Sequence, residues 1–246
     1  AKGMPVINYI AIESGDRVTA TVSVKDIKGE GFLTMITRYG EIKRTEMSRF
    51  SNIRANGLIA FDIEDGDELG WVLKTGGNED ILIITHNGQS IRFRETGVRD
   101  RSRAAGGVKA MTLRGEDVIV SAAVARPEAT VLVVGENGYG KRTEVAEYRI
   151  QGRGGSGILT MNCTAKTGKV IGAEIVDDDD RLLVMTMQGK AIRMKVKDIR
   201  LVGRVAQGVK LIDLGAGDQV RSIARVVQEA DEGDIETNGD EDSTEA

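Results

Sequence analysis

The feature that most constrains this chain is a repeat of about 50 residues. Four short apolar runs are each followed by a glycine, and an arginine stands four residues after each glycine. The runs are Phe32–Ile36, Ile81–Ile84, Val131–Val134 and Leu182–Met185, the glycines are Gly40, Gly88, Gly138 and Gly189, and the arginines are Arg44, Arg92, Arg142 and Arg193. A unit of this length cannot bury its own apolar strands, so we expect the units to fold by stacking on one another.

Two further motifs recur in the same register. An Arg-x-x-x-Gly sequence occurs at Arg103–Gly107, Arg153–Gly157 and Arg204–Gly208, with a shorter copy at Arg54–Gly57. An acidic turn occurs at Gly15-Asp16, Gly66-Asp67, Glu116-Asp117 and Gly217-Asp218, and Thr167-Gly168-Lys169 departs from it. These motifs predict four repeats over residues 17–66, 67–116, 117–168 and 169–226. Residues 1–16 then end a truncated earlier unit of a longer protein, and residues 227–246 form a disordered acidic tail.

Within each repeat the pattern is that of β-structure. Ile91–Arg94 and Ala191–Lys195 alternate apolar and basic residues, as half-buried strands do. Asn87-Gly88 and Asn137-Gly138 are strong hairpin-turn signals. Only a segment such as Thr143–Arg149 is suited to a helical turn. Roughly four strands per repeat is the size of a propeller blade, so we predict an all-β, propeller-like fold of about four complete blades plus a partial one.

The charge is divided unevenly along the chain. The net charge is −4, but residues 227–246 hold nine acidic residues and no lysine or arginine, which leaves 29 acidic against 34 basic residues before them. A basic body with an acidic tail is typical of nucleic-acid binders, although such a tail also serves solubility alone. A single Cys and a single His exclude a disulfide framework and a Cys/His zinc site. No apolar run is long enough for a membrane span, and we expect no membrane partner.

Four local features receive a structural interpretation. Gly152–Gly157 fits the dinucleotide-binding pattern G-x-G-x-x-G, but a strand rather than a helix is expected after it. Asp177–Asp180 lacks the ligand spacing of a calcium loop and is expected to be a solvated connection. His86 is expected beside a surface turn, and Cys163 in a strand as a small core residue. No catalytic or metal site is predicted.

The recurrent basic residues are the strongest chemical signal. We call them the basic belt: Lys43, Arg44, Arg92, Arg94, Lys141, Arg142, Arg193 and Lys195 on strands, with Arg103, Arg153 and Arg204 in the connecting loops. Stacked repeats would align these side chains, and such a belt neutralises phosphates without reading base sequence. Aromatic residues are only 4%, which fits duplex DNA better than stacked single strands.

Several motifs carry a resemblance to a known family. Gln151–Gly157 is similar to the box motif QRRGGKG, Glu136–Thr143 is followed by Glu147-Tyr148, and Val202–Arg204 is followed by Gln207–Val209. In this order, with the acidic tail, they resemble the C-terminal DNA-wrapping domain of the DNA gyrase A subunit. Gln151, Arg153, Gly154, Gly155 and Gly157 match the box, whereas Gly152 and Ser156 differ, and the motif lies in the third complete repeat rather than the first.

The resemblance implies a β-pinwheel whose blades exchange strands and whose outer edge wraps double-stranded DNA. It further implies a parent type II topoisomerase that introduces negative supercoils in the bacterial cytoplasm, associated with the nucleoid. ATP, Mg²⁺ and the catalytic groups would belong to the parent complex, which contains the gyrase B subunit, together with a second copy of the A subunit. Two alternatives stay open: the corresponding domain of topoisomerase IV, and a propeller that binds other proteins.

Overall fold

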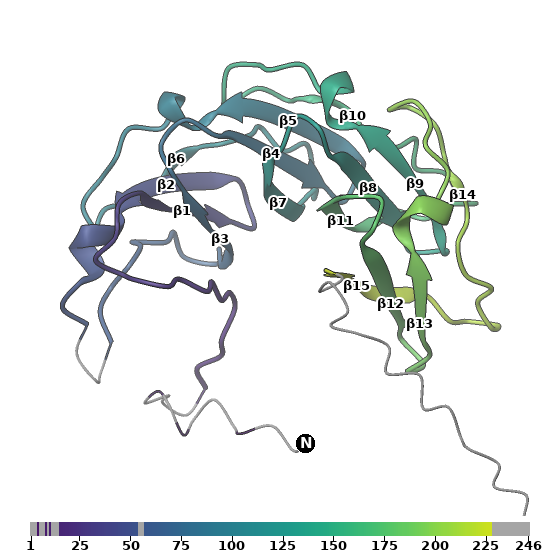
Figure 1. Ribbon diagram of the computed structural model, residues 1–246, viewed down its shortest axis with the longest axis horizontal. Helices are drawn as coiled ribbons and strands as arrows, with labels where there is room; N and C mark the ends of the chain where they lie inside the picture. Colours follow the sequence, from purple (N-terminus) through teal and green to yellow (C-terminus); the bar gives the residue numbers. More distant parts are fainter. Residues whose placement is uncertain (1–3, 5–7, 9, 11–14, 54–56, 228–246) are drawn as a thin grey trace, which may run out of the picture.

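Four small antiparallel sheets follow one another along an open arc (Figure 1). The computed structural model describes residues 4, 8 and 10 and the ranges 15–53 and 57–227. Within them lie fifteen strands and short 3-10 helices, so the predicted all-β fold is confirmed. No helix in these ranges is long and apolar enough to cross a membrane.

Each sheet, or blade, contains a hairpin and a third strand that pairs with the hairpin's first strand. Blade 1 holds β1 (Phe32–Thr37), β2 (Glu41–Glu46) and β3 (Leu69–Thr75), and blade 2 holds β4 (Asp80–Thr85), β5 (Gln89–Arg94) and β7 (Ile119–Ala125). Blade 3 holds β8 (Thr130–Gly135), β9 (Tyr139–Glu144) and β11 (Val170–Val176), and blade 4 holds β12 (Arg181–Thr186), β13 (Ala191–Lys195) and β15 (Val220–Val226). A 3-10 turn follows each hairpin: η2 (Met47–Phe50), η3 (Glu95–Gly97), η4 (Val145–Glu147) and η5 (Val196–Asp198).

The fourth strand of a blade comes from the repeat that follows it. Three two-residue strands, β6 (Val108–Lys109), β10 (Ile158–Leu159) and β14 (Val209–Lys210), pair with β2, β5 and β9. They lie in the connections before β7, β11 and β15, so each connection completes the preceding blade. This is the strand exchange expected of a pinwheel. Among the described residues, no strand pairs with the outer edge of β13, and blade 4 has three strands.

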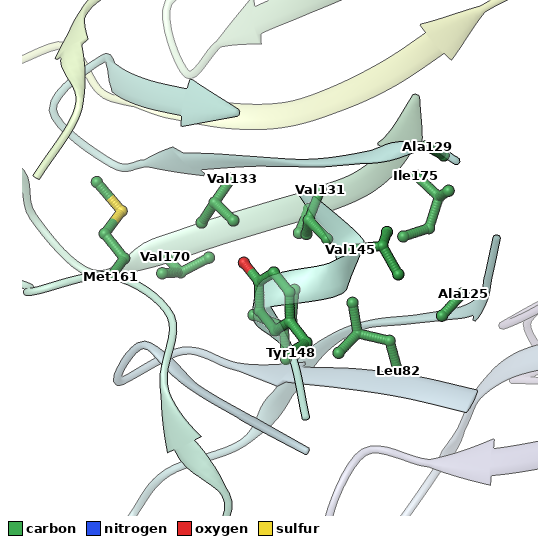
Figure 2. Close-up of a cluster of buried hydrophobic side chains, with 12 residues drawn as sticks. Leu82, Ala125, Ala129, Val131, Val133, Val145, Tyr148, Met161, Val170 and Ile175 are labelled. Carbon is green, nitrogen blue, oxygen red and sulfur yellow. The ribbon is translucent and has the colours of Figure 1, made fainter. Parts of the chain in front are cut away.

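The apolar core lies between blades rather than within them. Ile81 and Ile83 of β4 pack with Ile36 and Ile42 of blade 1. The alternate residues of β4 pack toward blade 3, where the Tyr148 ring lies among Leu82, Val131 and Val145 (Figure 2). Because successive side chains of a strand point to opposite faces, a strand covered on both faces needs an unbroken apolar run. This explains why the first strand of each hairpin reads as such a run.

The recurrent turn residues are explained by hydrogen bonds at the hairpin tips. The Oδ1 atoms of Asp67, Asp117 and Asp218 accept the backbone N–H of Tyr39, Asn87 and Gln188 at 2.9–3.0 Å. In the third repeat, where the acidic turn is missing, the Thr167 carbonyl accepts the N–H of Asn137 instead. The hairpin tips of blades 1 to 3 also contact the next blade, as when Val170 N–H donates to the carbonyl of His86. The acidic turns therefore position the hairpins.

The blades and the predicted repeats are out of phase. The third strand of each blade follows the acidic turn, so β3, for example, begins beyond residue 66, where the first repeat was expected to end. The predicted tail and the shorter motif at Arg54–Gly57 lie wholly or mostly outside the described residues, as does most of the predicted partial unit at 1–16.

Candidate nucleic-acid interface

The outer edge of blades 1 to 3 is made by the second hairpin strand and the exchanged strand beside it, and that of blade 4 by β13 among the described residues. The strand residues of the basic belt lie at this edge. The Arg-x-x-x-Gly loops cover the same edge as they lead into the exchanged strands. The structure separates the belt into three environments: fully buried lysines, largely buried arginines between blades, and solvent-exposed side chains.

Lys43 and Lys141 are completely buried, so the expectation that they lie in an exposed belt is wrong. The Lys43 ammonium donates to the carbonyl oxygens of Ala60, at 2.6 Å, Arg103 and Ala105. The Lys141 ammonium donates to the carbonyls of Gly203, at 2.9 Å, and Arg204. Burial lowers the pKa of each lysine to about 8. Each ammonium thus fastens the loop of the next repeat onto its own blade.

Blade 2 has Ile91 at the same place, so the Gln151–Gly157 loop has no cation beneath it. Thr112 of the preceding connection holds this loop instead, through its N–H to the Gly155 carbonyl and its hydroxyl to the Gly154 carbonyl. Gly157 has φ +74°, and a Cβ there would lie 2.2 Å from the carbonyl oxygen of Ser90. This glycine is required by the close approach of the exchanged strand to β5, whatever its relation to DNA.

Arg44, Arg92 and Arg142, which we call the clamp arginines, join each of the first three blades to the next. Arg92 pairs with Asp80 at 2.7 Å and donates to the carbonyls of Val145 and Tyr148 in the next blade. Arg142 pairs with Asp178 and donates to the Ile199 carbonyl. Arg44 lies 3.6 Å from the buried carboxylate of Glu95, whose pKa burial raises. Their guanidinium groups are mostly withdrawn from solvent.

The arginine at this repeat position in blade 4 differs from the clamp arginines. Arg193 of β13 is exposed, and its side chain has no hydrogen bond or ion pair with another described residue. Lys195 is also exposed, and the Arg94 side chain is 62% exposed with its Nε 3.4 Å from Asp80. These three belt residues lie at the surface, as expected.

Arg103, Arg153 and Arg204, the loop arginines, contact the preceding connection. Arg103 donates to the Ile59 carbonyl at 3.2 Å, and Arg204 donates to the Leu159 carbonyl. Arg153 donates through Nε to the Gly97 carbonyl at 2.9 Å and through one Nη to the Lys109 carbonyl at 3.0 Å. Arg153 is nevertheless exposed, and its second Nη group makes no protein hydrogen bond within the described residues. Gln151 is half-buried, with its side-chain nitrogen unpaired in the same part of the chain.

The sequence motifs based on the apolar runs missed one further row of basic residues. Arg99, Arg149 and Arg200 are exposed, and each directly follows the buried residue that ends a 3-10 turn. We call them the turn-end arginines. Their spacing of 50 and 51 residues matches the repeat. An alignment of the repeats on the segments that follow the hairpins, rather than on the hairpins themselves, would therefore have identified them.

The remaining candidate residues have structural surroundings. His86 lies at a hairpin tip with its Nδ1 2.8 Å from the Val170 carbonyl. Cys163 is half-buried in a loop, not in the predicted strand, and burial raises the pKa of its thiol. Asp177 pairs with Arg126 at 2.7 Å in the connection between β11 and β12. No group of three or more metal-binding side chains is found in the described part of the chain.

Comparison with known proteins assigns the fold to a family. A family model described as the DNA gyrase C-terminal domain, β-propeller, matches residues 32–75, 79–126, 129–177 and 180–226. The chain is 44% identical over 247 residues to the DNA gyrase A subunit of Staphylococcus aureus strain NCTC 8325, covering 99% of this chain and 28% of the relative. It is 44% identical over 234 residues to the same protein of Staphylococcus epidermidis strain ATCC 12228, covering 94% of this chain and 26% of the relative. The chain therefore spans about a quarter of the length of these curated relatives.

Two solved structures have the same architecture. The C-terminal domain of DNA topoisomerase IV superposes with a TM-score of 0.84 at 25% identity, covering 91% of this chain and 70% of that one. A DNA gyrase A C-terminal domain superposes with a TM-score of 0.82 at 24% identity, covering 92% and 76%. The backbone fold is thus common to both enzymes, whereas the sequence is much closer to the staphylococcal gyrase relatives.

Proposed function

Because the chain belongs to the family of DNA gyrase C-terminal β-propeller domains, we propose that it binds duplex DNA along the outer edge of its blades and bends it around the arc. The binding is independent of base sequence, because the exposed groups at this edge are guanidinium and ammonium groups suited to phosphates.

The observation that carries the proposal is the exposure of basic side chains at the outer edge, on β5 of blade 2, on β13 of blade 4 and in the loop at Gln151–Gly157. Arg94, Arg153, Arg193 and Lys195 reach solvent at the outer edge. The buried members of the belt support this surface indirectly, since Lys43, Lys141 and the clamp arginines hold the blades and loops in place. A stiff scaffold with exposed cations holds a DNA backbone in a fixed curve.

Within a longer protein, we propose that this domain serves a gyrase. Wrapping would present DNA so that the parent type II topoisomerase introduces negative supercoils with ATP. The catalytic groups, ATP and Mg²⁺ would lie elsewhere in an assembly of two A and two B subunits, associated with DNA in the bacterial cytoplasm. The match to the gyrase family model and the identity of 44% to the gyrase relatives favour gyrase over topoisomerase IV.

The test measures both binding and wrapping. Labelled duplexes of unrelated sequence should bind with equal affinity, and the affinity should fall steeply with salt, by a slope of roughly 0.9 in log K per phosphate contact. Relaxing a plasmid with a type I topoisomerase in the presence of the chain, and then removing protein, should leave trapped supercoils. Binding that is indifferent to salt contradicts the DNA interface, and relaxed plasmid despite binding contradicts wrapping.

A further inference from the structure

Each of blades 2, 3 and 4 presents one arginine at the point where the chain leaves a 3-10 turn and crosses to the preceding blade. These are the turn-end arginines Arg99, Arg149 and Arg200. The residue before each is buried: Val98 and Tyr148 are 1% exposed and Ile199 is 2% exposed. The residue after each forms a parallel bridge to the clamp arginine of the preceding blade, at Asp100, Ile150 and Leu201.

This register directs the three arginines outward. The residues before them have extended backbones, with φ between −106° and −83°. Side chains alternate along an extended chain, so a buried residue at one position places its successor on the solvent side. All three arginines are accordingly exposed.

The turn-end arginines also differ from the clamp arginines and the loop arginines in having no side-chain partner among the described residues. The clamp arginines are bound between blades, and the loop arginines donate to carbonyls of the preceding connection. Arg99, Arg149 and Arg200 make no side-chain hydrogen bond or ion pair with another residue in the ranges that the structure describes. Their guanidinium groups keep their donors available for a ligand.

The 3-10 turn itself does not require arginine at this place. Blade 1 has Ser51 in the equivalent position, directly after the buried Phe50 that ends η2. The turn of blade 1 therefore ends without a cation, whereas the three arginines stand where the chain also bridges to a preceding blade.

We propose that Arg99, Arg149 and Arg200 form a row of phosphate contacts, one per blade, that guides the DNA duplex from blade to blade. This inference rests on the proposed function and assigns the contacts within it. An unpartnered guanidinium binds phosphate oxygens in a two-pronged geometry that ammonium does not reproduce. The row recurs at the blade period, and a duplex presents phosphates at regular intervals along its edge, so one side chain per blade can meet the backbone repeatedly.

The test compares two triple variants that remove the same charge. The first is Arg99→Ser, Arg149→Ser and Arg200→Ser, with serine taken from the equivalent place in blade 1. The second is Lys25→Ser, Lys74→Ser and Arg221→Ser, which changes exposed cations before β1 and on β3 and β15, the strands at the opposite edge of their blades. Binding to a linear duplex is measured over a range of salt, with thermal melts to verify folding.

We expect the first variant to lose roughly 2 to 3 units of the slope of log K against log salt, and the second to keep the parent slope. If the parent chain binds DNA and both variants have equal slopes, the proposed row of phosphate contacts is contradicted, and the proposed function stands. A parent chain that does not bind duplex overturns both. If the serine variant melts early, Arg99→Lys, Arg149→Lys and Arg200→Lys takes its place, and an affinity equal to the parent's overturns the two-pronged contact. If poly-glutamate displaces the labelled duplex as well as unlabelled duplex of the same total charge does, the preference for a DNA backbone is contradicted.

Discussion

At the scale of single residues, the two buried lysines show how burial reverses an expectation from sequence. Lys43 and Lys141 follow the alternation of exposed strand residues, but other parts of the chain cover them. Lys43 lies under the Phe61 ring and the loop that contains Arg103, and Lys141 lies under the loop that contains Arg204. Alternation marks a solvent face only where one face of a sheet is open. Sequence alone could not show that a neighbouring repeat supplies the carbonyls for these ammonium groups, because those carbonyls belong to residues about 60 positions away.

The buried lysines make stability depend on pH in a defined direction. Their pKa is about 8 in the folded chain, below the ordinary value of 10.5, so the folded state binds fewer protons between these values. We expect these groups to make the free energy of unfolding rise with pH from about 8 to about 10, by on the order of 1 kcal/mol per lysine. Above about pH 10, Tyr148 acts in the opposite sense, because burial raises its pKa to about 12.

Urea unfolding at several pH values measures this effect. Lys43→Met and Lys141→Met together should flatten the rise. They should also lower stability at neutral pH by about 1–3 kcal/mol for each carbonyl left without a donor. An identical pH profile in the parent and the double variant would show that the lysines titrate normally.

Substitutions of Arg153 distinguish two roles of its side chain, which are binding phosphate and joining neighbouring connections. Its contacts with the Gly97 and Lys109 carbonyls are exposed, so Arg153→Ala should cost only about 1 kcal/mol of stability. It should reduce the salt slope of DNA binding by about one unit, because one Nη group is available for phosphate. Arg153→Lys should restore the charge and part of the affinity. A large fall in melting temperature with an unchanged slope would make Arg153 a latch between connections and not a DNA contact.

At the scale of secondary-structure elements, the sequence predicted the hairpins well and the exchanged strands poorly. The hairpins carry long apolar runs and glycine turns, which are local signals. The strands β6, β10 and β14 have two residues each and pair with a different repeat, so nothing in their own sequence marks them. The Arg-x-x-x-Gly motif before each was visible, but its position over the preceding blade follows only from the three-dimensional arrangement.

A glycine substitution tests the exchange directly. Gly157 precedes β10, has a positive φ and leaves no room for a Cβ beside the Ser90 carbonyl. We expect Gly157→Ala to lower stability by at least about 1–3 kcal/mol and to release β10 from β5, which hydrogen exchange of the Ser90 and Ile158 amides would report. Gly152→Ala is the matched control in the same loop, since nothing lies within 4 Å of its Cβ position and its φ is not positive. Equal effects of the two substitutions would contradict strain as the cause.

At the scale of the whole molecule, the repeat produces three equivalent junctions between four blades. Each junction combines an exchanged strand, a clamp arginine and a core shared between neighbouring sheets. Because every junction repeats the same step, the blades follow a regular curve, shown by the arc in Figure 1. Under the proposed function, a regular curve with exposed cations along one edge would hold a bent duplex by a few phosphate contacts from each blade.

The distribution of charge over the whole chain gives the last prediction. Residues 1–226 carry an excess of basic over acidic residues, whereas residues 227–246 carry nine acidic residues and no basic ones. The tail follows β15 in the chain, so under the proposed function we expect its carboxylates to compete with DNA phosphates for the exposed arginines at a high local concentration. Deleting residues 227–246 should therefore tighten DNA binding at low salt, and the gain should shrink as salt screens the attraction. The matched control keeps the length of the tail and replaces its Asp and Glu residues by Asn and Gln, which should tighten binding as much as deletion does. If deletion tightens binding but neutralisation does not, the tail acts by excluding volume, and equal affinities in all three chains would limit it to a role in solubility.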